Sequence, residues 1–123
     1  CTSPYTILLG DYNLNLGTYP AVPAVACFDA KGRPVEENNA KAWVYTYQTD
    51  ASTIKRDTAE YASNYDHFSF DERTRRIVRM DSIHSIDLVN QYTKAGDVTP
   101  EQKFDRYRKE VSDHLPIIME VEL

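Results

Sequence analysis

The sequence is poor in the residues that would mark a zinc protein, a disulfide-rich protein or a membrane span. Its two cysteines, Cys1 and Cys27, could form one disulfide, but two thiols say little about the compartment. The three histidines, His67, His84 and His114, are too scattered to give a zinc-ligand spacing. No apolar run reaches the length of a membrane span, and the sequence contains no signal-peptide pattern.

Composition and charge narrow the class of protein further. A length of 123 residues predicts a single domain, and 41% hydrophobic with 27% charged residues is typical of a globular chain rather than a disordered one. A net charge of −5 argues against a protein that coats nucleic acid by bulk electrostatics, although a nuclease with local basic groups stays possible. Because a strand pattern begins almost at Cys1, with no initiator Met, we expect a piece of a longer protein.

Hydrophobic periodicity predicts an α+β fold built on mostly hairpin-connected strands. The clearest strand is the second half of Val111–Leu123, where apolar residues alternate from Ile117 and Pro116 can open the strand. The expected strands and hairpins are Tyr5–Leu9, Ala26–Glu36, Trp43–Thr49, Ser52–Lys55, Tyr65–Phe70, Arg76–Asp81 and Ile117–Leu123.

Helices are expected only late in the chain. Thr99–Glu110 has the best signal, because Thr99 can cap, Pro100 suits the first helical position and Gln102 completes a capping box. Apolar residues around Ile86–Val89 indicate a shorter helix, whereas Asp71–Arg75 is expected to be a polar turn.

Three polar clusters lie on the expected strands or at their ends. They are Gly10-Asp11-Tyr12-Asn13, Tyr65-Asp66-His67 and Ser112-Asp113-His114-Leu115-Pro116. Acids and imidazoles at strand ends are well placed to act on a ligand, since loops there are held by a rigid scaffold. Each cluster alone is a weak signal, but their order along the chain is informative.

Together these clusters resemble the endonuclease/exonuclease/phosphatase superfamily of metal-dependent phosphohydrolases. Its members carry G-D-[FY]-N, a strand with [IY]-D-x and S-D-H-x-P, in the order seen here between Thr6 and Leu123. The resemblance implies hydrolysis of a phosphoester, which needs an oriented water, a proton acceptor and positive charge on the phosphoryl oxygens. The substrate type stays open among nucleic acid, phospholipid head groups and inositol phosphates.

The resemblance also implies a role for each residue. Asp11 would take a proton from the attacking water or orient it, and Asn13 would be a hydrogen-bonding partner there. His114 would donate to a phosphate oxygen, with Asp66 fixing its tautomer and favouring its charged form. Asp113, with Asp11, would lie near a divalent metal, and carboxylate oxygens suit Mg²⁺ or Mn²⁺.

The family domain is longer, and the resemblance covers only its carboxyl-terminal half. We therefore expect one β-sheet layer with flanking helices, half of a four-layer α/β/β/α sandwich. The family's principal metal-binding glutamate and a further histidine belong to the amino-terminal half, so this chain alone is expected to be inactive. The missing half is the expected partner; without it, the exposed sheet face is expected to promote dimerisation or domain swapping.

Simpler interpretations remain beside the enzymatic one. Asp11 and Asn13 could serve only as turn formers, and Asp66 with His114 could be a structural salt bridge. A non-catalytic binding or assembly module that kept the fold is the alternative function. His67 should face away from Asp66, because neighbours in a strand alternate, and is expected to pack or lie at the surface. His84 is expected at the surface.

Overall fold

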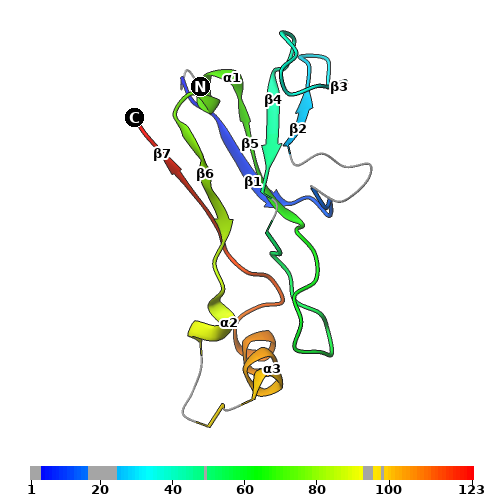
Figure 1. The fold of residues 1–123 in the computed structure, drawn as a ribbon, viewed down its shortest axis with the longest axis vertical. Helices are drawn as coiled ribbons and strands as arrows, with labels where there is room; N and C mark the ends of the chain where they lie inside the picture. The colour runs from blue at the N-terminus through cyan, green and yellow to red at the C-terminus, as the bar shows by residue number, and fades with distance from the viewer. Residues whose placement is uncertain (1–3, 17–24, 49, 93–95, 98) are drawn as a thin grey trace.

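The fold is α+β, as the periodicity predicts, with short helices beside mostly antiparallel strands (Figure 1). The structure is a computed structural model that describes residues 4–16, 25–48, 50–92, 96–97 and 99–123. Its elements are β1 (Ile7–Asp11), β2 (Val25–Phe28), β3 (Pro34–Val35), β4 (Val44–Tyr47), β5 (Asp66–Asp71), α1 (Glu72–Arg75), β6 (Val78–Ser85), α2 (Leu88–Gln91), α3 (Pro100–Glu110) and β7 (Ile117–Val121).

Five antiparallel strands form the larger sheet, in the order β1-β5-β4-β2-β3. Alternation along β5 gives this sheet two different faces. Phe68 and Phe70 are buried on one face, and His67 and Ser69 are buried on the other. Asp66 shares the face of Phe68 by the same alternation, as expected from the sequence.

The strands divide into two sheets, whereas one layer was expected. β6 and β7 form a separate antiparallel pair with an irregular register between Arg79 and His84. Val78 and Ile83 of β6 join a core cluster with Phe68 and Phe70, and residues of β7 pack against that cluster. The β6–β7 pair therefore covers the phenylalanine face of the larger sheet, because its own apolar side needs burial.

The predicted strand boundaries need small corrections that matter for the site. The first strand runs from Ile7 to Asp11, so Asp11 belongs to the strand rather than following it. The strand expected at Arg76–Asp81 begins at Val78 and continues to Ser85. Ser52–Lys55 is not a strand, because Thr53 and Ile54 form only isolated bridges, to His114 and Tyr61.

The other strand predictions largely hold. β2 and β3 form the expected hairpin, whose turn uses Gly32 at φ 80° and the Asp29 side chain as acceptor. β4 covers Val44–Tyr47; Trp43 precedes it and is exposed, and Thr49 lies outside the described residues. Cys27 is buried as a free thiol, and Cys1 also lies outside the described part.

The helices agree with their local signals, with one addition. α3 has the predicted capping box between Thr99 and Gln102, and it buries Phe104 and Tyr107. The expected polar turn is a single helical turn, α1, because the Asp71 carboxylate accepts from the backbone nitrogen of Thr74 at 2.8 Å. Among the described residues, no helix is long and apolar enough to span a bilayer.

A second, smaller core lies at the helical end of the molecule. In Figure 1, α2 and α3 lie together at the end opposite α1 and β3. Phe104, Tyr107 and Val89 of these helices pack with Ile54 and Leu115 from the loops. Because Leu115 directly follows His114, this core anchors the segment that carries the histidine.

Candidate functional site

The candidate site begins where β1 ends and β5 begins. These strands are antiparallel, and Asp11 lies directly opposite Asp66 in their register. Opposed residues of an antiparallel pair project from the same face, so both carboxylates lie on the side covered by β6 and β7. Two acids that are 55 positions apart in the sequence are therefore brought together by strand pairing alone.

The loop before β7 brings His114 to this sheet end. The backbone nitrogen of Leu115 donates to the Ser52 carbonyl at 2.7 Å, and that of Ile54 donates to the Asp113 carbonyl at 2.9 Å. From α3, the Tyr107 hydroxyl donates to the His114 carbonyl at 2.7 Å. The backbone of the S-D-H segment is thus held on both sides of the imidazole.

Three carboxylates surround the His114 imidazole. Nδ1 lies 2.7 Å from Oδ2 of Asp66, while Nε2 lies 3.7 Å from Oδ2 of Asp11 and 3.9 Å from Oδ1 of Asp113. Because a carboxylate only accepts, Nδ1 must donate to Asp66, and this bond fixes the tautomer of the neutral ring. The pairing of Asp66 with His114 expected from the sequence is present.

The three acids differ in exposure, which separates what each can do. The Asp66 side chain is 16% exposed and the Asp113 side chain 77% exposed. Asp66 is further fixed because its backbone nitrogen donates to the Ser52 hydroxyl at 3.0 Å. Asp66 is therefore suited to orient the imidazole, while Asp113 and Asp11 lie toward solvent, where a ligand or ion would approach.

The charges favour the protonated imidazole. Burial lowers the pKa of His114, but the hydrogen bond to Asp66 and the charges of Asp66, Asp113 and Asp11 raise it by more. The net effect is a pKa above the usual 6.5. His114 is therefore protonated more readily than a free imidazole, and its charged form can present the proton on Nε2 to an anionic oxygen.

The loop after β1 has a strained conformation at Asn13. Asn13 has φ 51°, in the left-handed region, and its backbone nitrogen donates to Oδ1 of Asp11 at 3.0 Å. Asparagine tolerates this region better than most residues. Because this bond uses Oδ1 of Asp11, the other oxygen, Oδ2, is the one near His114. Asp11 and Asn13 therefore form the turn that the simpler interpretation expected, and this turn lies beside the imidazole.

The site offers part of a metal-binding shell. Within the described ranges, no group of three or more His, Cys, Asp or Glu side chains could hold a metal ion. Asp11 and Asp113 both approach the Nε2 side of His114, and Mg²⁺ commonly takes one or two carboxylates and keeps several waters. These two carboxylates fit such an ion in type, although they do not form a closed site.

Several supporting residues were not foreseen from the sequence. Ser52 accepts a hydrogen bond from the Asp66 backbone and Tyr107 donates one to the His114 carbonyl, yet the sequence identified them only as parts of an expected strand and an expected helix. His67 was expected merely to pack or lie at the surface, and it proves to be fully buried. No local signal distinguishes these roles, because the partner atoms lie far away in the sequence.

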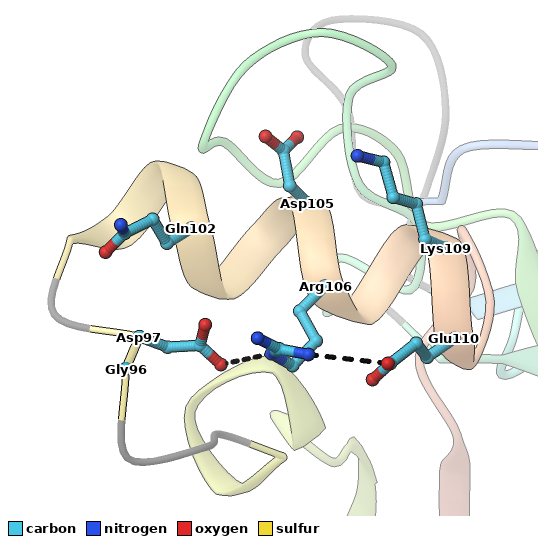
Figure 2. A pocket seen from close by; sticks show the side chains of 7 residues that line it. All are labelled: Gly96, Asp97, Gln102, Asp105, Arg106, Lys109 and Glu110. Atoms are coloured by element: carbon cyan, nitrogen blue, oxygen red, sulfur yellow. Dashed lines mark hydrogen bonds and ion pairs between the residues drawn. The ribbon is translucent and has the colours of Figure 1, made fainter.

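Two basic residues of α3, Arg106 and Lys109, line a separate depression of about 380 Å³ together with acidic and neutral side chains (Figure 2). Figure 2 shows Arg106 between two carboxylates, and its ion pairs are with Asp97 and Glu110. Arg108 donates to the carbonyl oxygens of Lys55 and Thr58. These arginines tie α3 to neighbouring segments, and the depression is assigned no function.

Comparison with models of protein families, with curated proteins and with solved structures finds no match.

Proposed function

We propose that this chain carries part of the active site of a metal-dependent phosphoester hydrolase. The observation that supports this proposal best is the set of three carboxylates around His114, with Asp66 at 2.7 Å from Nδ1 and Asp11 near Nε2. Each of these residues belongs to a different motif of the resemblance, and strand pairing and loop contacts bring them to one place. A half-buried acid, an oriented imidazole and a second, more exposed acid are groups that hydrolysis of a phosphoester uses.

In this proposal His114 binds the phosphoryl group. Asp66 holds Nδ1, and the raised pKa of His114 keeps a proton on Nε2 for donation to a phosphoryl oxygen. Asp11 orients the attacking water and accepts its proton, and Asn13 donates a hydrogen bond beside it. The left-handed backbone at Asn13 turns the chain immediately after Asp11, which keeps both side chains at the same end of β1.

Asp113 and Asp11 would hold the divalent ion, Mg²⁺ or Mn²⁺, together with water. A bound ion of this kind supplies positive charge that stabilises the phosphoryl oxygens. The resemblance assigns a further glutamate to the ion, from an amino-terminal half of the domain. The two carboxylates of this chain would then complete a site that neither half forms alone.

The β6–β7 sheet offers the amino-terminal half of the domain a place to bind. The β6–β7 pair has only two strands among the described elements, so the outer edges of both strands present unpaired backbone groups. Further strands added there would extend the layer over the phenylalanine face, as a four-layer α/β/β/α sandwich requires.

Hydrolysis of a model phosphodiester tests the function. The chain should be assayed with Mg²⁺, alone and together with an amino-terminal half of the kind that the resemblance implies, and turnover is expected in the joined form. His114→Ala and Asp11→Ala should each lower kcat by about 100-fold or more. His84→Ala is the matched control, because His84 is exposed and belongs to β6.

Two outcomes would contradict the enzymatic proposal. Near-normal kcat in His114→Ala or Asp11→Ala would remove these residues from the mechanism. A joined form without turnover on nucleic acid, phospholipid and inositol phosphate substrates would favour the non-catalytic binding module instead.

A further inference from the structure

His67 is a buried histidine for which packing alone gives no reason. It follows Asp66 on β5 and projects from the opposite face of the sheet. Its side chain is fully buried, and in the part of the chain that the structure describes Nδ1 has no hydrogen-bond partner. A leucine or phenylalanine would fill this space without leaving a polar nitrogen unsatisfied in the interior.

The other ring nitrogen contacts the loop that carries Asn13. Nε2 of His67 donates to the carbonyl oxygen of Leu14. The ring also packs edge-on against Tyr12, with 5.6 Å between centroids and 68° between the ring planes. His67 therefore contacts the residues on both sides of Asn13, and Asn13 is where the backbone takes its left-handed turn.

The neighbours of His67 hold the rest of the same loop. The backbone nitrogen of Tyr12 donates to the Tyr65 carbonyl at 2.7 Å. The Asn64 side chain accepts from the backbone nitrogen of Leu16 at 3.1 Å and donates to the Leu16 carbonyl at 2.6 Å. Segment 64–67 thus binds both ends of loop 12–16, while its residue Asp66 binds His114 on the other face.

We propose that His67 is a positioning residue that holds loop 12–16 so that the backbone of Asn13 stays bonded to Asp11 beside His114. Asp66 and His67 are adjacent on β5, and they then hold two different parts of one site, the His114 side chain and loop 12–16. The strand β5 thus fixes the His114 imidazole through Asp66, and it fixes the loop that follows Asp11 through His67. This inference rests on the proposed hydrolase function only for its catalytic consequence, because the contacts with loop 12–16 exist independently of it.

The reach of the side chain gives a sharp test. Glutamine can place its amide nitrogen near the position of Nε2, whereas the amide of asparagine reaches only as far as Nδ1. His67→Gln should therefore keep the bond to the Leu14 carbonyl, and His67→Asn should lose it. In His67→Asn the amides of Tyr12 and Leu16 should exchange hydrogen about tenfold faster or more, with exchange in β4 unchanged.

The catalytic consequence is measured in the active, joined form. His67→Asn should lower kcat by about 10- to 100-fold with little change in KM, because the acid and the water are misplaced rather than removed. His67→Gln should restore both kcat and slow amide exchange. His84→Asn is the matched control, since His84 is exposed and its Nδ1 lies 2.7 Å from a backbone oxygen of its own strand.

Each outcome has a definite meaning. Equal rates of amide hydrogen exchange at Tyr12 and Leu16 in His67→Asn, in His67→Gln and in the parent chain would overturn the proposal. Faster exchange in His67→Asn with no turnover in the parent enzyme would keep the positioning of the loop and reject the hydrolase function. If His67→Asn does not fold, His67→Leu replaces it, because leucine fills the buried space without a donor and should also speed exchange.

Discussion

At the scale of single residues, the site depends on the charge balance around His114. The imidazole is partly buried, which by itself disfavours its charged form. Asp66, Asp11 and Asp113 reverse this preference, so the pKa of His114 is raised in the folded protein. The same acids that could act on a ligand therefore also make the stability of the fold depend on pH.

The Asp66→Asn variant tests this balance. An asparagine oxygen can still accept from Nδ1 of His114, but the charge that raises the His114 pKa is lost. Because the folded pKa exceeds the unfolded value near 6.5, the stabilisation is complete below pH 6.5 and disappears as pH rises through the folded pKa. In urea unfolding, the free energy of unfolding of the parent should exceed that of the variant at pH 6. This difference should become smaller by pH 9. A difference in the free energy of unfolding that does not change with pH would contradict the role of Asp66 in raising the His114 pKa.

At the scale of elements, the site is placed by loops that α3 holds. α3 contributes Phe104 and Tyr107 to the smaller core, and the Tyr107 hydroxyl donates to the His114 carbonyl. The bridge between Thr53 and His114 holds the same segment from the connection between β4 and β5. A helix without any site residue therefore determines where the imidazole lies.

Tyr107→Phe should destabilise the protein without altering its fold. It leaves the partly buried carbonyl of His114 without the hydroxyl donor, which costs about 1–2 kcal/mol. Tyr92→Phe is the matched control, because the Tyr92 hydroxyl donates to Glu110 at an exposed position and should cost less than about 0.5 kcal/mol. Denaturant unfolding measures both. Equal losses in the two variants would show that Tyr107 does not anchor the segment of His114.

At the scale of the whole molecule, two sheets share one core. Phe68 and Phe70 of the larger sheet and Val78 and Ile83 of β6 belong to the same cluster. The site lies at one end of this interface, at the last residue of β1, the first residue of β5 and the segment that precedes β7. Separation of the two sheets would therefore remove His114 from Asp11 and Asp66.

Phe70→Ala tests the shared core. Phe70 is 2% exposed, and its truncation should cost about 3–5 kcal/mol, a large part of the about 5–15 kcal/mol by which an ordinary domain is stable. Leu8→Ala serves as the control, because Leu8 is 64% exposed on the edge strand β1 and should cost little. Thermal unfolding distinguishes the two. A small loss in Phe70→Ala would indicate that β6 and β7 do not depend on the larger sheet.

The exposed edge of β1 predicts self-association of the isolated chain. Leu8 and Leu9 are 64% and 67% exposed on a strand whose outer side has no partner among the described strands. Apolar edge strands of this kind pair with other chains. Sedimentation velocity should detect dimers or larger species, and Leu8→Lys with Leu9→Lys should reduce them. A parent chain that stays monomeric at high concentration would contradict this prediction.

The sequence by itself determined the elements whose signals are local. The α+β class and the capping box at Thr99 follow from periodicity and side-chain chemistry within a few residues. The separation of Asp66 from His67 onto opposite faces follows from strand alternation in the same way. The three motifs also predicted that Asp66 would pair with His114, and the 2.7 Å bond between them is present.

Only the tertiary structure decided how these elements are arranged. The separate β6–β7 sheet, the bridge from Thr53 to His114, the hydroxyl bond of Tyr107 and the contact of His67 with Leu14 join distant parts of the chain. Such contacts depend on which surfaces remain to be buried after the elements form, and no local pattern records that. The residue types of the site were therefore readable in the sequence, whereas its supports were fixed by packing.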